Sequence, residues 1–161
     1  MDNLALIEYI IEDHSRIGND IKSIGRLFTD QEAIYLLQKS HGEWIPGRPD
    51  NLLKELNKLI DTITSLKAGL KKHFAFEEKA LAAMIGELLT KSLLSQHAGI
   101  MKKLDDVEST ITNLTLNSMN RDEILEKEMG VQRELGILCE MIEDHARKEE
   151  VLLDMLKAGL R

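Results

Sequence analysis

The chain of 161 residues has little of what β-sheet proteins and disulfide-stabilised proteins need. Aromatic residues make up only 4% of it, and its two prolines both fall within residues 41–50. Because β-sheets favour aromatic and β-branched residues bounded by frequent turns, this composition argues against an all-β fold. The single cysteine, Cys139, can form neither an intrachain disulfide nor a thiolate metal site.

Positive charge is also scarce. Lysine and arginine total 21 against 28 aspartates and glutamates, giving a formal net charge of −7 with no basic cluster. We therefore expect the protein to bind neither nucleic acid nor an anionic membrane. The first residues lack the basic start of a signal peptide, and no apolar run approaches the roughly 18 residues of a membrane span. These absences predict a cytoplasmic protein.

What the sequence does contain is four long segments whose apolar residues recur three and four apart, the spacing of amphipathic helices. The first covers about 7–37, with a possible break at Thr29 and Asp30, and the others cover about 52–85, 87–114 and 122–156. Two prolines and two glycines predict that residues 41–50 form a loop, and Gly86 and residues 115–121 supply the other turns. The expected fold is all-α, one domain over residues 1–161, with a long helical hairpin around loop 41–50. Its architecture would be an antiparallel up-down-up-down four-helix bundle.

One short pattern, H-x-x-x-E-E-x-x-L, occurs twice, beginning at His73 and at His145. A spacing of four on a helix places the histidine and the first glutamate on one face, one turn apart. Two more histidines, His14 and His97, stand singly within the apolar stripes of the other two segments. Each predicted helix therefore carries one histidine on its inner face.

The positions of these four histidines relative to the turns can be compared directly. Two residues at one level of an antiparallel hairpin are equidistant from its turn. Successive pairs of the four histidines are centred at residue 85, at residue 121 and at residues 43–44, and each centre lies in or beside a predicted connection. All four are therefore expected to share one layer, about 15–20 Å from the bundle end at Gly86.

A layer of four imidazoles and two carboxylates is costly to bury without partners, and a pair of metal ions removes that cost. Imidazole suits iron, copper, nickel and zinc, while carboxylates can bridge two cations and offset their charge. The lack of sulfur ligands disfavours copper(I) and iron–sulfur clusters. Two non-haem irons fit this donor set best.

With these motifs the sequence resembles the hemerythrin-like (HHE cation-binding) domains, from His14 to Leu153. The pattern that carries the resemblance is a lone histidine, HFAFEE, a second lone histidine and HARKEE, in that order. The resemblance implies a four-helix bundle that holds two iron ions with a bridging oxo or hydroxo group. By position, it implies six metal ligands, four terminal histidines and two bridging glutamates: His14, His73, His97, His145, Glu77 and Glu149.

The sequence departs from the oxygen-carrying invertebrate hemerythrins, which place two histidines four residues apart on the third helix. Here the residue four after His97 is Met101. The remaining set of four histidines and two glutamates is similar to that of iron-sensing and iron–sulfur-repair members. In some members the last carboxylate lies five after its histidine, which would be Glu150. A step of five turns through about 500°, away from the His145 face, so Glu149 is the preferred ligand.

These features predict a di-iron protein that binds or senses dioxygen, a related molecule such as nitric oxide, or iron, rather than one that turns over a substrate. One alternative is oxygen or nitric oxide reduction, or iron delivery to damaged iron–sulfur clusters. A second is a metal-free helical interaction module. The absence of Glu-x-x-His and of His-Glu-x-x-His argues against ferritin-like oxidases and zinc proteases. Apolar stripes at 24–37 and 52–66 leave a homodimer open.

Overall fold

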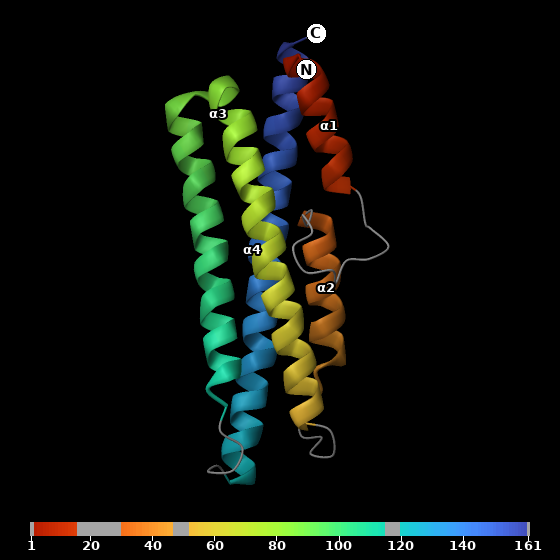
Figure 1. The fold of residues 1–161 in the computed structure, drawn as a ribbon, viewed down its shortest axis with the longest axis vertical. Helices are drawn as coiled ribbons and strands as arrows, with labels where there is room; N and C mark the ends of the chain where they lie inside the picture. Colours follow the sequence, from red (N-terminus) through yellow and green to blue (C-terminus); the bar gives the residue numbers. More distant parts are fainter. Residues whose placement is uncertain (1, 16–29, 47–51, 115–119, 161) are drawn as a thin grey trace.

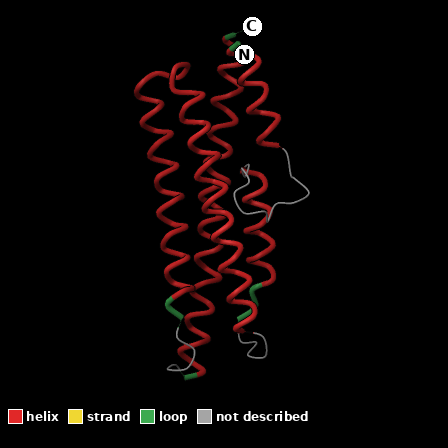
Figure 2. Tube along the Cα trace, viewed as in Figure 1, coloured by secondary structure: helices red, strands yellow, loops and turns green. Residues whose placement is uncertain are grey.

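The computed structural model describes residues 2–15, 30–46, 52–114 and 120–160, and the side chains of residues 13–15 lie outside the description. Within these residues the protein has no strand and consists of four helices: α1 (Asn3–Ser15), α2 (Asp30–Glu43), α3 (Leu52–Thr112) and α4 (Arg121–Gly159). Short loops are the only other described structure (Figure 2). The all-α prediction is confirmed, and the helices pack as a four-helix bundle.

Helix α3 contains the turn predicted at Gly86. This residue has φ 79° and ψ 177°, which interrupts the helix. Figure 1 shows the chain reversing direction there, so that the two halves of α3 lie side by side. An ion pair of 2.6 Å between Lys67 and Asp105 joins the two halves. Both partners lie 19 residues from Gly86, which is the equidistance expected of a helical hairpin.

The other two sides of the bundle are formed by α4 and by the pair α1 and α2, which follow one another along α4 (Figure 1). Helix α4 begins at a cap in which the Asn120 side chain accepts a 2.9 Å hydrogen bond from the backbone N–H of Glu123. The Gln38 side chain bonds Glu143, and Trp44 donates to the carbonyl of Glu128. Later residues of α2 therefore contact earlier residues of α4.

The end of α2 corrects the prediction that residues 41–50 form a loop throughout. Helix α2 continues to Glu43 and includes Gly42. A glycine costs about 1 kcal/mol in a helix but does not break it, and the first proline comes only at Pro46. Trp44, which follows the helix, is buried and donates a 2.8 Å bond to Glu128. Packing of this end against α4 thus outweighs the propensity of one glycine.

Within the described part of the chain, the buried apolar residues form two separate clusters. The larger joins α2 to both halves of α3 and to α4, and includes Leu37, Leu66 and Leu104. The smaller lies nearer Gly86 and includes Ile7, Leu81 and Leu153. In each half of α3 and in α4, the histidines and glutamates of the expected metal layer lie between residues of the larger cluster and residues of the smaller one.

Several residues of the apolar stripes for which a second chain was considered are buried by the chain's own helices, whereas Leu53 is 65% exposed. Leu36, Leu37, Ile63 and Leu66 are at most 1% exposed. The part of the stripe at residues 24–29 lies outside the described residues. None of the described helices has an apolar stretch long enough to cross a membrane.

Candidate metal centre

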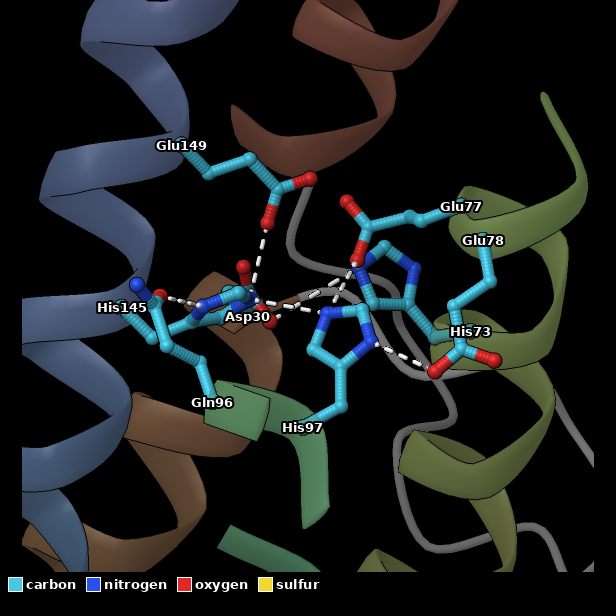
Figure 3. Close-up of polar contacts among 8 residues, drawn as sticks. All are labelled: Asp30, His73, Glu77, Glu78, Gln96, His97, His145 and Glu149. Carbon is cyan, nitrogen blue, oxygen red and sulfur yellow. Dashed lines mark hydrogen bonds and ion pairs between the residues drawn. The ribbon is translucent and has the colours of Figure 1, made fainter. Parts of the chain in front are cut away.

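Five of the six predicted ligands meet in one buried layer. His73 and Glu77 come from the first half of α3, His97 from its second half, and His145 and Glu149 from α4. Each is at most 2% exposed. Figure 3 shows their imidazoles and carboxylates turned toward one another. The sixth, His14, belongs to the last turn of α1, and its side chain lies outside the described part of the chain.

The donor atoms form two groups that share one carboxylate. In the first group, ligand atoms of Glu77, His97, His145 and Glu149 all lie within 4.8 Å of one another. In the second, ligand atoms of Asp30, His73 and Glu77 meet the same limit. Each group offers imidazole nitrogen and carboxylate oxygen, and Glu77 belongs to both. This is the arrangement that two neighbouring cations with a shared carboxylate require.

The i,i+4 spacing of the repeated motif brings each histidine to its glutamate, as the sequence predicts. His145 Nε2 lies 2.8 Å from Glu149 Oε2, and His73 Nε2 lies 3.2 Å from Glu77 Oε1. Glu77 Oε1 also lies 3.5 Å from His97 Nε2 on the opposite half of α3. Glu77 therefore faces histidines on both halves of the hairpin.

Two polar side chains hold the histidine rings from outside the layer. Glu78 Oε1 lies 3.0 Å from His97 Nδ1, and Gln96 Oε1 lies 2.8 Å from His145 Nδ1. Because both oxygens accept, each ring donates from Nδ1, and Nε2 is the nitrogen that faces the layer. Ligand histidines in metalloproteins are commonly oriented by such outer acceptors.

Phe74 lies among three of the histidine rings. Its ring stacks on His97 with centroids 3.9 Å apart and planes 8° apart, and it meets His145 edge-on at 5.6 Å and His73 at 5.9 Å. Phe74 is 3% exposed. The ring therefore restricts rotation of the imidazoles and keeps water from this side of the layer.

The structure also distinguishes the two adjacent glutamates of each motif by their burial and contacts. Glu149 is 2% exposed and faces His145, whereas Glu150 is exposed. Glu78 is half-buried and bonds the outer nitrogen of His97, as expected of a carboxylate that supports a ligand.

Periodicity does not reveal two of the residues found here. Asp30 begins α2, is fully buried and lies 3.6 Å from His73 Nε2. Its sequence signal is only that of an acidic residue at the start of a helix. Gln96 precedes His97 and has no pattern that distinguishes it from other polar helix residues.

Residues 5–156 match the family model of the hemerythrin HHE cation-binding domain. The chain belongs to the hemerythrin family. No curated protein and no solved structure gives a significant match. The match covers nearly the whole chain, and it includes His14 together with the three histidines and two glutamates that meet in the layer.

The residues of this hemerythrin domain fit a pair of bound cations. Two groups of nitrogen and oxygen donors share a carboxylate, and the outer acceptors orient His97 and His145 so that their Nε2 atoms face the other donors. Cys139, which lies in α4 with His145, belongs to neither group of donors. Burial raises the pKa of the Cys139 thiol to about 12, so the thiolate needed for ligation does not form near neutral pH.

Proposed function

We propose that this hemerythrin-family protein is a non-haem di-iron protein that binds or senses dioxygen, a related small molecule such as nitric oxide, or iron itself. The observation that carries the proposal is the pair of donor groups that share Glu77. The proposal takes the helices as an antiparallel up-down-up-down bundle in one domain, with His14 of α1 as a further terminal ligand. No nucleic acid or membrane partner is part of it.

The ligands would divide between two irons. His97, His145 and Glu149 would hold one, His73 would hold the other, and Glu77 would reach both. When bound, two irons would supply redox chemistry and open coordination positions for a small molecule. We favour iron because imidazole and carboxylate ligands without thiolate suit it, and because the family is a cation-binding one.

The side chains around the layer support binding rather than turnover. Glu78 and Gln96 orient two rings, and Phe74 packs against three. These contacts hold the ligands in place and exclude bulk water, as reversible binding of a small apolar molecule requires. The polar side chains described around the layer form hydrogen bonds to the ligands themselves. The proposal therefore includes no separate pair of catalytic acid and base.

An anaerobic ferrous titration followed by controlled exposure to air tests the proposal, with visible absorption and iron content per chain as readouts. We expect two irons per chain and a charge-transfer band after exposure. A band that disappears when oxygen is removed indicates reversible binding. An immediate and lasting ferric spectrum indicates sensing or redox use, and release of iron to a chelator after exposure indicates iron delivery.

Two variants make the titration specific. Glu77→Gln removes the shared charge and is expected to abolish binding of the pair. Glu128→Gln removes a carboxylate that is also buried, at 3% exposure, but lies 17 residues before His145 along α4, or roughly 25 Å away. It should bind two irons like the unmodified chain. Absence of iron uptake by the unmodified chain would contradict the di-iron proposal and favour a metal-free interaction module.

A further inference from the structure

Asp30 is a carboxylate that the metal layer contains in addition to the six predicted ligands. It is the first residue of α2 and is fully buried. Its Oδ1 lies 3.6 Å from His73 Nε2, and its donor atoms group with those of His73 and Glu77 within 4.8 Å. Figure 3 places it beside the ligand rings. A fourth side of the bundle therefore contributes a donor.

Burial of three carboxylates in one layer needs compensating positive charge. Asp30, Glu77 and Glu149 are each at most 2% exposed, and Glu77 shares donor groups with both of the others. Like charges this close disfavour one another's ionised form, and burial adds to that cost. Two divalent cations carry four positive charges, which three carboxylates offset more fully than two.

We propose, on the basis of the di-iron function above, that Asp30 is a metal ligand and that it gives the His73 position a carboxylate of its own, as Glu149 does for the other position. One position takes two imidazoles, from His97 and His145, together with Glu149. The other takes His73 and the carboxylate of Asp30, with Glu77 reaching both. Each position thus has one carboxylate of its own beside the shared Glu77, and Asp30 makes the His73 position better suited to cations that prefer oxygen ligands than His73 and Glu77 alone would.

A carboxylate at the His73 position has a consequence for specificity. Oxygen donors favour manganese more than imidazole does, so loss of the Asp30 carboxylate should weaken manganese binding more than cobalt binding.

A helix-terminal aspartate has a simpler role that must be separated from ligation. Acidic residues at the start of a helix stabilise it by accepting backbone hydrogen bonds and by opposing the helix dipole. Asparagine caps a helix about as well as aspartate. The variant Asp30→Asn therefore keeps the capping ability while it removes the charge, which makes it a test of ligation.

The experiment titrates the full chain with Fe²⁺ under anaerobic conditions, and separately with Co²⁺ and Mn²⁺. It follows metal content per chain, the Co²⁺ absorption bands and the thermal midpoint with and without metal. For Asp30→Asn we expect one metal to bind as it does in the unmodified chain. The affinity for the second metal should fall by at least ~10–100-fold, because loss of even an outer hydrogen-bond partner of a ligand costs that much. Manganese binding should fall most. The control Glu128→Gln should match the unmodified chain.

Each outcome decides the matter. Two metals bound by Asp30→Asn with unchanged affinity and unchanged Co²⁺ bands would overturn the role of Asp30 while the di-iron function stands. An equal loss in Asp30→Asn and Glu128→Gln would show a general effect on the fold and would also overturn it. Absence of metal from the unmodified chain would remove the di-iron function itself. If Asp30→Asn does not fold, Asp30→Glu retains the charge, and shifted Co²⁺ bands are then the expected result and unchanged bands the contrary one.

Discussion

The Nε2 atoms of His97 and His145 lie 3.2 Å apart, on rings that come from different helices. Each ring donates its Nδ1 hydrogen outward, so the two Nε2 atoms are the nitrogens that face each other across the layer. Two nitrogens that each bind one ion at about 2.1 Å, at an angle near 90–110°, are roughly 3.0–3.4 Å apart. The separation of this pair therefore suits two ligands of a single cation.

Loss of the outer acceptor of His97 should weaken metal binding without removing a ligand. In Glu78→Ala the His97 ring loses the partner that fixes its orientation, so we expect the affinity for Co²⁺ or Fe²⁺ to fall by about 10–100-fold. Glu78→Gln retains an accepting oxygen and should lose less. A metal titration followed by absorption measures both, and equal affinities for Glu78→Ala and the unmodified chain would show that this hydrogen bond does not orient the ring.

Two adjacent glutamates on α4 provide a matched pair for the second carboxylate of the centre. Glu149→Gln removes a charge that is buried against His145, so we expect at least one of two metals to be lost. Glu150→Gln alters an exposed side chain and should leave metal content unchanged. Metal analysis of the purified variants measures this, and the opposite ranking would mean that Glu150 faces the layer.

The turn at Gly86 should tolerate no side chain although it has room for one. Nothing lies within 4 Å of a Cβ placed there, but its φ of 79° with ψ of 177° is a conformation adopted almost only by glycine. We expect Gly86→Ala to lower the free energy of unfolding of the metal-free protein by about 1–3 kcal/mol.

Gly42 is the control for that substitution. It also has nothing within 4 Å of a Cβ, but its φ is not positive and it lies in α2. Gly42→Ala should therefore leave stability unchanged or raise it by up to about 1 kcal/mol. Urea unfolding of both variants makes the comparison, and equal effects at the two positions would refute the backbone explanation.

The buried thiol of Cys139 should lower the stability of the folded protein at alkaline pH. Burial, together with the nearby Glu143 carboxylate, raises the pKa of its thiol from 9.0 to about 12. Between these values the folded chain retains a proton that the unfolded chain releases, so stability is full below pH 9 and declines as pH rises toward 12. Cys139→Ala should show a smaller decline, as measured by urea unfolding at pH 8 and 10. Rapid alkylation of the native thiol at pH 8 would contradict its burial.

The sequence allowed the layer to be anticipated because histidines on helices have a fixed rise and period. His73, His97 and His145 could be placed at one level from their distances to the turns, and the i,i+4 spacing placed Glu77 and Glu149 beside two of them. No such rule reaches Asp30, because its position depends on where α2 begins rather than on any repeat. Gln96 was missed because a residue adjacent to a ligand along the chain gains its role only from the way two helices pack.

The extent of α2 shows a different limit. Gly42 suggested a loop from local propensity, which is worth about 1 kcal/mol, whereas burial of Trp44 against α4 contributes more. Helix ends are decided by such tertiary contacts, and a single sequence does not display them. The metal-layer prediction was less exposed to this error, since five of its six residues lie well inside the long helices α3 and α4.

The two apolar clusters bear on how the bundle comes apart. Regions of contiguous apolar contact tend to unfold locally as units. In this bundle the polar layer divides the apolar core into a large cluster and a small cluster near Gly86. In the absence of metal the small part, which includes Ile7, Leu81 and Leu153, can open while the rest stays folded. Metal ligation from both halves of α3 and from α4, as proposed above, would tie the two parts together, so that amide exchange at the Gly86 end would have to await global unfolding. A bound pair of cations would then also make the unfolding of the bundle cooperative.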